Sequence, residues 1–225
     1  MKYSKVQYDL WRVRARLDRK LAKMTPEQVQ QYFDQVLNDF EARTGTRLQV
    51  IKVGRTMQGK GQAMNDLRLY IETSVWSNWY ADDAPERRAA TQEFLRMCRA
   101  AGNTAVLYVS QLVMDELQAA SARLADDFMR LVHEHSTVML RPDDKAYALA
   151  EAYAAHGAIP PSRKADRLHA AIATVAEVDM LVSWNYRHLV NASRRQRITS
   201  VNRFAGYPRG IEILTPPEVF EDEIQ

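Results

Sequence analysis

Residues 69–76 read Leu-Tyr-Ile-Glu-Thr-Ser-Val-Trp, in which a short apolar run ends at Glu72. Such a run is typical of a buried strand, and residues 104–109 (Thr-Ala-Val-Leu-Tyr-Val) form a second one. Segments with helical periodicity separate these runs. This alternation predicts a three-layer α/β/α domain with a mainly parallel sheet, whose right-handed crossovers cover both faces. Further strands are expected at 137–140, 180–183 and 211–214, and helices at about 86–101, 110–116, 121–133, 143–156 and 162–176.

The N-terminal region differs from this pattern and predicts a helical arm. Residues 25–28 (Thr-Pro-Glu-Gln) supply an N-cap, a first-turn proline and a capping-box glutamine for a second helix, which Gly45 ends. Residues 48–53 fit a short strand. The apolar stripes need a partner surface, because two short helices cannot bury them alone. In the first helix the apolar stripe comprises Val6, Leu10, Val13, Leu17 and Leu21, and the other faces are assigned to Arg12, Arg14, Arg16, Arg19 and Lys20.

Charge and glycine content divide the chain near residue 64. Residues 54–64 contain three glycines and no periodicity, which is typical of a linker. We therefore expect an arm and linker at 1–63 and an α/β domain at 64–225. Residues 1–64 carry a net charge of +7 and the remainder −4, which indicates a polyanion contact, an electrostatic contact between the two parts, or simply solvated surfaces.

Composition excludes several classes of protein. The single cysteine, Cys98, excludes an internal disulfide and a multi-cysteine metal site, and it suits a reducing cytosol. No apolar stretch approaches the ~18 residues of a membrane span, and the basic N-terminus does not resemble a signal peptide. A chain with 8 glycines has no Gly-rich phosphate loop, which argues against a nucleotide-binding protein. We expect a cytoplasmic protein without a membrane partner.

Four polar side chains are expected at the carboxyl edge of the sheet, where open parallel sheets bind ligands. Glu72 and Asn185 each follow a strand, Glu116 lies in the helix after 104–109, and Asp166 lies in the first turn of a later helix. Three carboxylates so close together would repel one another without a cation, and oxygen ligands suit Mg²⁺ or Mn²⁺. Among 28 acidic residues some must fall at strand ends by chance, so solvated carboxylates remain an alternative.

Four segments together resemble the signature blocks of the PIN domain family, in the family's order. The similarity covers about residues 67–220, and it implies a small metal-dependent ribonuclease of the kind found as toxins in bacterial toxin–antitoxin pairs. The resemblance implies hydrolysis of RNA phosphodiester bonds by metal-activated water. The four segments are Leu69 to Trp76, Ser110 to Leu117, Ala165 to Ala171 and Leu181 to Leu189.

The resemblance also implies roles for individual residues. Glu72, Glu116 and Asp166 would form the acidic, metal-binding cluster, and Thr73 would orient it by hydrogen bonding. Glu72 departs from the commonest family pattern, which has Asp, and its extra methylene moves the carboxylate. Asn185 stands where many members have a further Asp, so it brings no negative charge. This set would hold one metal ion firmly and a second only with substrate.

Other polar residues near these positions allow two interpretations. His169 shares a helix face with Asp166 and is either a satisfied core histidine or a contact to the site. Arg187, His188 and the basic residues that flank Asp166, including Arg163, are candidates for RNA phosphate contacts. Their alternative is an ordinary solvated surface.

The arm is similar in organisation to the short antitoxins paired with such toxins. This resemblance implies that the arm docks on the α/β domain, in cis or swapped between molecules. It also implies that an arginine, from Arg12 to Arg19 or from Arg43 and Arg47, competes with the metal for the carboxylates. A homodimer and a DNA contact through the arm are further partners that the resemblance suggests.

The sequence therefore predicts a toxin-like, Mg²⁺- or Mn²⁺-dependent endoribonuclease held in check by its own arm. The alternative is a catalytically weak PIN-like binding module whose basic arm contacts DNA or RNA. Metal dependence separates the two, because a chelator abolishes cleavage but leaves salt-dependent binding.

Overall fold

A computed structural model describes residues 4–45, 50–52, 67–100, 105–120, 122–135 and 138–223. Its centre is a six-stranded sheet of order β1-β4-β3-β2-β5-β6, in which every described pairing is parallel. The predicted α/β fold is confirmed. The expected strand residues 48, 49, 53, 104 and 137 lie outside the described ranges. The strands are β1 (Val50–Lys52), β2 (Leu67–Ile71), β3 (Ala105–Ser110), β4 (Val138–Arg141), β5 (Met180–Val182) and β6 (Glu212–Leu214).

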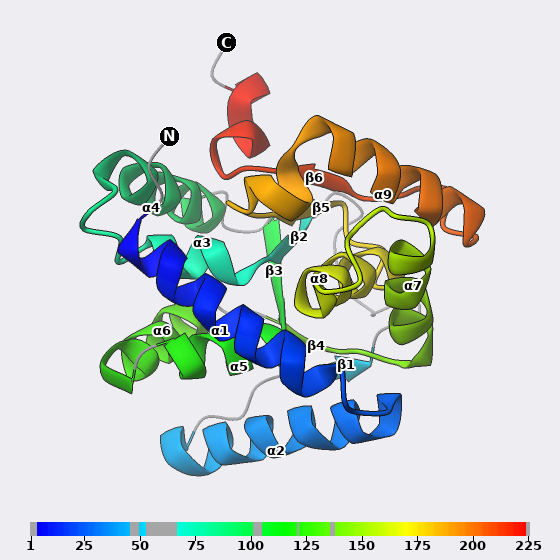
Figure 1. Cartoon of the computed structure of the whole chain (residues 1–225). Coiled ribbons are helices and arrows are strands. Elements are labelled where there is room, and N and C mark those ends of the chain that lie inside the picture. Colours follow the sequence, from blue (N-terminus) through cyan, green and yellow to red (C-terminus); the bar gives the residue numbers. More distant parts are fainter. Residues whose placement is uncertain are drawn as a thin grey trace.

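Helices cover both faces of this sheet. They are α1 (Lys5–Leu21), α2 (Pro26–Thr44), α3 (Thr73–Asn78), α4 (Pro85–Ala100), α5 (Gln111–Ala120), α6 (Ala122–Glu134), α7 (Asp144–Ala155), α8 (Lys164–Val175) and α9 (Ala192–Phe204). A π-helical turn, η1 (Tyr186–Val190), and a 3₁₀ segment, η2 (Pro217–Glu223), complete the set. Figure 1 shows α5 and α6 on one side of the sheet and α7, α8 and α9 on the other.

The strand order defines where a ligand can bind. The chain steps from β2 to β3 to β4 in one direction, then returns to place β5 on the opposite side of β2. The connections that leave β2 and β5 therefore diverge, and the crevice at the carboxyl ends of these two strands is the topological switch point. The residues that follow β2 and β5 begin at Glu72 and Ser183.

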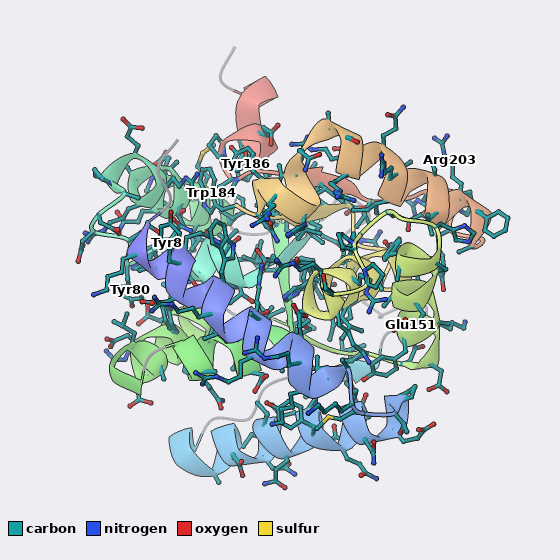
Figure 2. The ribbon with its side chains drawn as sticks, in the orientation of Figure 1. Tyr8, Tyr80, Glu151, Trp184, Tyr186 and Arg203 are labelled. Atoms are coloured by element: carbon teal, nitrogen blue, oxygen red, sulfur yellow. The ribbon has the colours of Figure 1, made fainter. Side chains whose placement is uncertain are left out.

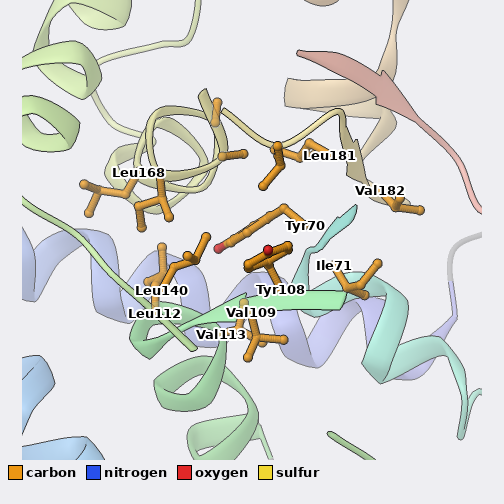
Figure 3. Close-up of a cluster of buried hydrophobic side chains, with 14 of the residues drawn as sticks. Tyr70, Ile71, Tyr108, Val109, Leu112, Val113, Leu140, Leu168, Leu181 and Val182 are labelled. Carbon is orange, nitrogen blue, oxygen red and sulfur yellow. The ribbon is translucent and has the colours of Figure 1, made fainter. Parts of the chain in front are cut away.

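The core lies between the sheet and its helices. Tyr70 on β2 is in register with Tyr108 on β3, and both rings are buried. Figure 3 shows these rings among Leu112 of α5, Leu140 of β4 and Leu168 of α8, all of them buried. Burying side chains of this size contributes about 1.5–3 kcal/mol each, so the core fixes the sheet edge that carries the polar residues.

The arm shares this core. Leu17 and Leu21 of α1 and Val29 and Phe33 of α2 belong to the same buried cluster as the sheet residues, and β1 pairs with β4. Figure 1 shows α1, in blue, crossing the molecule over α3, α5 and α8. The predicted capping box of α2 is present, with Gln28 N–H donating to Thr25 Oγ1 at 3.3 Å. The predicted linker and the boundary near residue 64 lie outside the described residues.

The assignment of Arg14 to a face of the first helix other than the apolar stripe was wrong. Arg14 is buried, whereas Arg12, Arg16 and Arg19 are exposed as expected. Arg14 lies four residues after Leu10 and three before Leu17, so it falls on the apolar stripe and not beside it. In the described part of the chain, no helix has the length and apolar character needed to cross a bilayer.

Candidate active site

Glu72 is held at the end of β2 by hydrogen bonds to one of its two carboxylate oxygens. It is the N-cap of α3, and its Oε2 accepts from Ser74 N at 3.1 Å and from the Ser74 hydroxyl. Ser183, the residue after β5, donates its hydroxyl to the same oxygen at 2.8 Å. The other oxygen, Oε1, faces the centre of the site. The longer glutamate side chain thus serves as both a helix cap and a site carboxylate.

Glu116 reaches the same point from α5. Its Oε2 accepts from Thr73 Oγ1 and lies 3.1 Å from His169 Nε2. Complete burial would raise the pKa of Glu116, but Arg14 and His169 outweigh that effect and hold it below its ordinary value. Glu116 is therefore an anion in the folded protein, as a metal ligand must be.

Asp166 lies in the first turn of α8, which begins at the carboxyl edge of the sheet. Asn185 donates its Nδ2–H to Asp166 Oδ1 at 2.8 Å. The amide oxygen of Asn185 accepts from His188 N at 3.1 Å. Asn185 therefore positions Asp166 through its amide nitrogen, while its own oxygen is engaged in the turn that opens η1.

His169 is both a core residue and a contact to the site. It is fully buried, with Nδ1 2.8 Å from the Tyr70 hydroxyl, which lies 2.7 Å from Ser110 Oγ. Because ionised Glu116 can only accept, Nε2 carries a proton and donates to it, while Nδ1 is paired with the Tyr70 hydroxyl. This network fixes the imidazole and, through it, the Glu116 carboxylate.

Arg14 of α1 occupies the centre of the cluster. Its Nε donates to Glu116 Oε1 at 2.9 Å, and its Nη2 donates to Glu116 Oε2 at 3.1 Å and pairs with Glu72. Its Nη1 donates to Asp166 Oδ1 at 3.2 Å. Burial alone would lower the pKa of Arg14, but the surrounding carboxylates raise it above its usual value. One cation therefore contacts all three carboxylates that the sequence singled out.

The donor set fits a divalent metal ion. Ligand atoms of Glu72, Glu116 and His169 lie within 4.8 Å of one another, and Asp166 meets the same guanidinium. Carboxylates suit Mg²⁺ and Mn²⁺, and both ring nitrogens of His169 are engaged with Glu116 and Tyr70. The guanidinium shows that these carboxylates together hold a cation in this fold.

Further polar contacts fasten the arm around the site. Asp18, one turn after Arg14, accepts from Ala165 N at 2.8 Å and so caps α8, whose own N-cap residue Arg163 makes no side-chain cap. Lys164 donates to Leu21 O at 3.0 Å. On α2, Tyr32 donates to Asp115, and Asp34 pairs with Arg141 at 2.5 Å. Burial raises the pKa of Asp18 to about 6.

Several basic and aromatic residues of the domain have structural partners. Arg194 donates to Ala158 O at 2.7 Å, and Arg195 donates to Glu218 at 2.9 Å. Arg167 is buried and pairs with Glu151 at 3.0 Å. Trp76 is fully buried and donates to Ile71 O at 3.2 Å. These residues stabilise the fold.

Fold and site together define a class: a parallel α/β protein with a buried acidic cluster at its switch point, as in metal-dependent hydrolases of phosphate esters. The model of the PIN domain family matches residues 69–191, more than half of the chain. The chain belongs to the PIN domain family. PIN domains are a nuclease fold that binds divalent metal ions and acts on nucleic acid. No curated protein and no solved structure matches the chain.

Proposed function

We propose that the protein is a cytoplasmic, metal-dependent endoribonuclease whose N-terminal arm closes its own active site. The arm comprises α1, α2 and β1 within residues 1–63, and the nuclease domain residues 64–225. The observation that supports this proposal is the position of Arg14, whose guanidinium contacts the carboxylates of Glu72, Glu116 and Asp166. A metal ion and this guanidinium require the same oxygens, so binding of one excludes the other.

Each residue of the cluster has a distinct role in the proposed reaction. Mg²⁺ or Mn²⁺ bound by Glu72, Glu116 and Asp166 would supply a water of lowered pKa for in-line attack on a phosphodiester. Thr73 and His169 hold the Glu116 carboxylate at the site. Asn185 holds Asp166 by its amide nitrogen.

The arm acts as a tethered inhibitor in this proposal, as an antitoxin does for a separate toxin. Its contacts in the structure are made within one chain, and they include the α8 cap by Asp18 and the packing of Leu17 and Leu21 into the shared core. Because the arm and the domain belong to one chain, the local concentration of the arm is raised to about the millimolar range. Docking in cis therefore keeps the site closed unless the arm is displaced.

The test measures RNA cleavage by four full-length proteins with Mn²⁺ and with Mg²⁺. Arg14→Met removes the inhibitory cation and keeps the helix, Arg16→Met is the matched control on an exposed face, and Arg14→Met with Asp166→Asn removes a ligand. We expect cleavage by Arg14→Met, low activity in the wild type and Arg16→Met, and none in the double variant. Chelation with EDTA should abolish the activity.

The same experiment tests the alternative of a binding module. The nuclease proposal would be overturned if Arg14→Met cleaves none of several RNAs with either metal while RNA binding persists in EDTA. The protein would then be a PIN-like binding protein. Gel filtration of the same samples tests the homodimer and the swapped arm. A double-stranded DNA probe tests the arm as a DNA-binding element.

A further inference from the structure

A cavity of about 280 Å³ lies beside the acidic cluster, between α1 and the nuclease domain. Tyr8, Trp11 and Arg12 line it from α1, and Arg163, Arg187 and His188 line it from the opposite side. Asp166, one of the three site carboxylates, also lines it. Figure 2 labels Tyr8, which lines the cavity from α1. It also labels Tyr186, the first residue of η1, the turn that carries Arg187 and His188. The cavity therefore adjoins the metal-binding position and remains open while the arm is docked.

The charges around this cavity favour an anion. Four arginines line it, of which Arg14 is paired with the site carboxylates, and its own carboxylate, Asp166, already accepts from Arg14 and Asn185. Arg12 has a weak ion pair of 3.7 Å with Asp9 on the same helix. Within the described ranges, the guanidinium groups of Arg163 and Arg187 form no ion pair. Their positive charges are thus available to a ligand.

His188 provides an independent observation that points to a ligand in the cavity. Both of its ring nitrogens are buried, and neither has a hydrogen-bond partner among the described residues. Buried polar groups of this kind are nearly always paired in folded proteins, and an unpaired one costs stability. Burial and the neighbouring cations Arg163 and Arg187 lower the pKa of His188, while Asp166 raises it. A bound anion would accept from a ring nitrogen that carries a proton and so pair that nitrogen.

We infer that Arg163, Arg187 and His188 form a subsite for a backbone phosphate of RNA, adjacent to the phosphate that the acidic cluster would cleave. The subsite rests on the proposed nuclease function. It separates RNA binding from RNA cleavage, because the arm blocks only the cleavage. Since α1 occupies the acidic cluster but leaves the subsite open, RNA binds the closed protein there without being cleaved. Arg12 of the docked arm adds a further cation to the same cavity.

Binding is measured on the full-length protein in EDTA, so that cleavage plays no part. The probe is a ribotetranucleotide with a 5′-phosphate and a 3′-fluorescein, followed by anisotropy over a range of salt concentrations. Arg163→Gln and Arg187→Gln are compared with Arg203→Gln, which removes the same charge at the exposed end of α9 (Figure 2). Inorganic phosphate is the competitor that distinguishes a simple anion site from one that needs the RNA.

We expect Arg163→Gln and Arg187→Gln each to weaken binding about tenfold, as the loss of a charge-assisted hydrogen bond does. Each should also reduce the slope of log K against log salt by about 0.7, the value for one phosphate contact on a single strand. Arg203→Gln should leave both quantities unchanged. Inorganic phosphate should compete only at much higher concentration than the RNA.

Three results would overturn the subsite. They are absence of binding by the wild type in EDTA, equal losses in Arg203→Gln and Arg163→Gln, and unchanged salt slopes in both cavity variants. If Arg14→Met cleaves RNA while the cavity variants bind normally, the subsite fails and the nuclease stands. If the cavity variants lose binding while Arg14→Met does not cleave, the nuclease fails instead.

Discussion

Replacement of Arg14 by methionine gives the most direct test of how the arm and a metal compete. The change removes one cation from three carboxylates, two of which, Glu72 and Glu116, are fully buried. Removal of one partner from a buried ion pair costs about 3–5 kcal/mol, because the remaining charges stay desolvated. At about 1.4 kcal/mol per factor of ten, the ratio of folded to unfolded protein falls about 10²- to 10³·⁶-fold.

Thermal unfolding in EDTA measures this loss. For a chain of this size, 1 kcal/mol corresponds to about 2–4 °C in Tm, so Arg14→Met should unfold roughly 6–20 °C below the wild type. Added Mn²⁺ should reverse part of the loss. At a hundredfold excess over its Kd, a ligand that binds only the folded state adds about 2.7 kcal/mol, or roughly 5–11 °C. The wild type should gain much less, since Mn²⁺ must first displace Arg14.

Arg16→Met is the control, because Arg16 lies on the same helix and is exposed. Its Tm should match the wild type with and without Mn²⁺. Equal Tm values for Arg14→Met and Arg16→Met in EDTA would refute the buried-charge argument. An equal gain from Mn²⁺ in the wild type and in Arg14→Met would refute the competition.

Three further perturbations test other contacts. Asp18→Asn keeps the cap on α8 but removes a carboxylate whose pKa rises from about 3.9 in the unfolded chain to about 6 in the folded protein. Ionisation of Asp18 therefore destabilises the folded state as the pH rises from 4 through 6. In denaturant titrations the variant should be more stable than the wild type by about 1–2 kcal/mol at pH 8 and should differ little from it at pH 4. Ser183→Ala removes a donor to Glu72 and, in the Arg14→Met background, should weaken Mn²⁺ binding about 10- to 100-fold by electron paramagnetic resonance; unchanged affinity would contradict the positioning role. Tyr32→Phe leaves Asp115 without its donor and should destabilise the full chain by about 1–3 kcal/mol in urea. No change would show that this hydrogen bond does not help to hold α2.

The sheet was predictable because each strand is a short apolar run between turns, and this pattern needs no knowledge of distant contacts. α9 was not expected, since only Ile198, Val201 and Asn202 of its residues are buried and its sequence shows little periodicity. α3 was not expected either. All six of its residues are buried, so no face alternates with solvent.

The acidic residues of the site were predictable from their positions after strands, but their partners were not. Ser183 and Ser74 meet Glu72 only because β2 and β5 are neighbours, and sequence spacing does not reveal that pairing. Arg14 was among the arginines that were expected to compete with the metal for the carboxylates. Its position on the same helix face as Leu10 and Leu17 distinguishes it from the other arginines of the helix. A charged residue in an apolar stripe indicates a buried partner, and that information was present before the structure.

The pairing of β1 with β4 affects what happens after the arm leaves. β4 is the strand that β1 covers, and without β1 its outer edge exposes unpaired backbone N–H and C=O groups. Exposed edges of this kind pair readily with strands of other molecules. If the arm is displaced as we propose, the open form is therefore also the form most prone to self-association, and its lifetime in solution is limited both by return of the arm and by loss to aggregates.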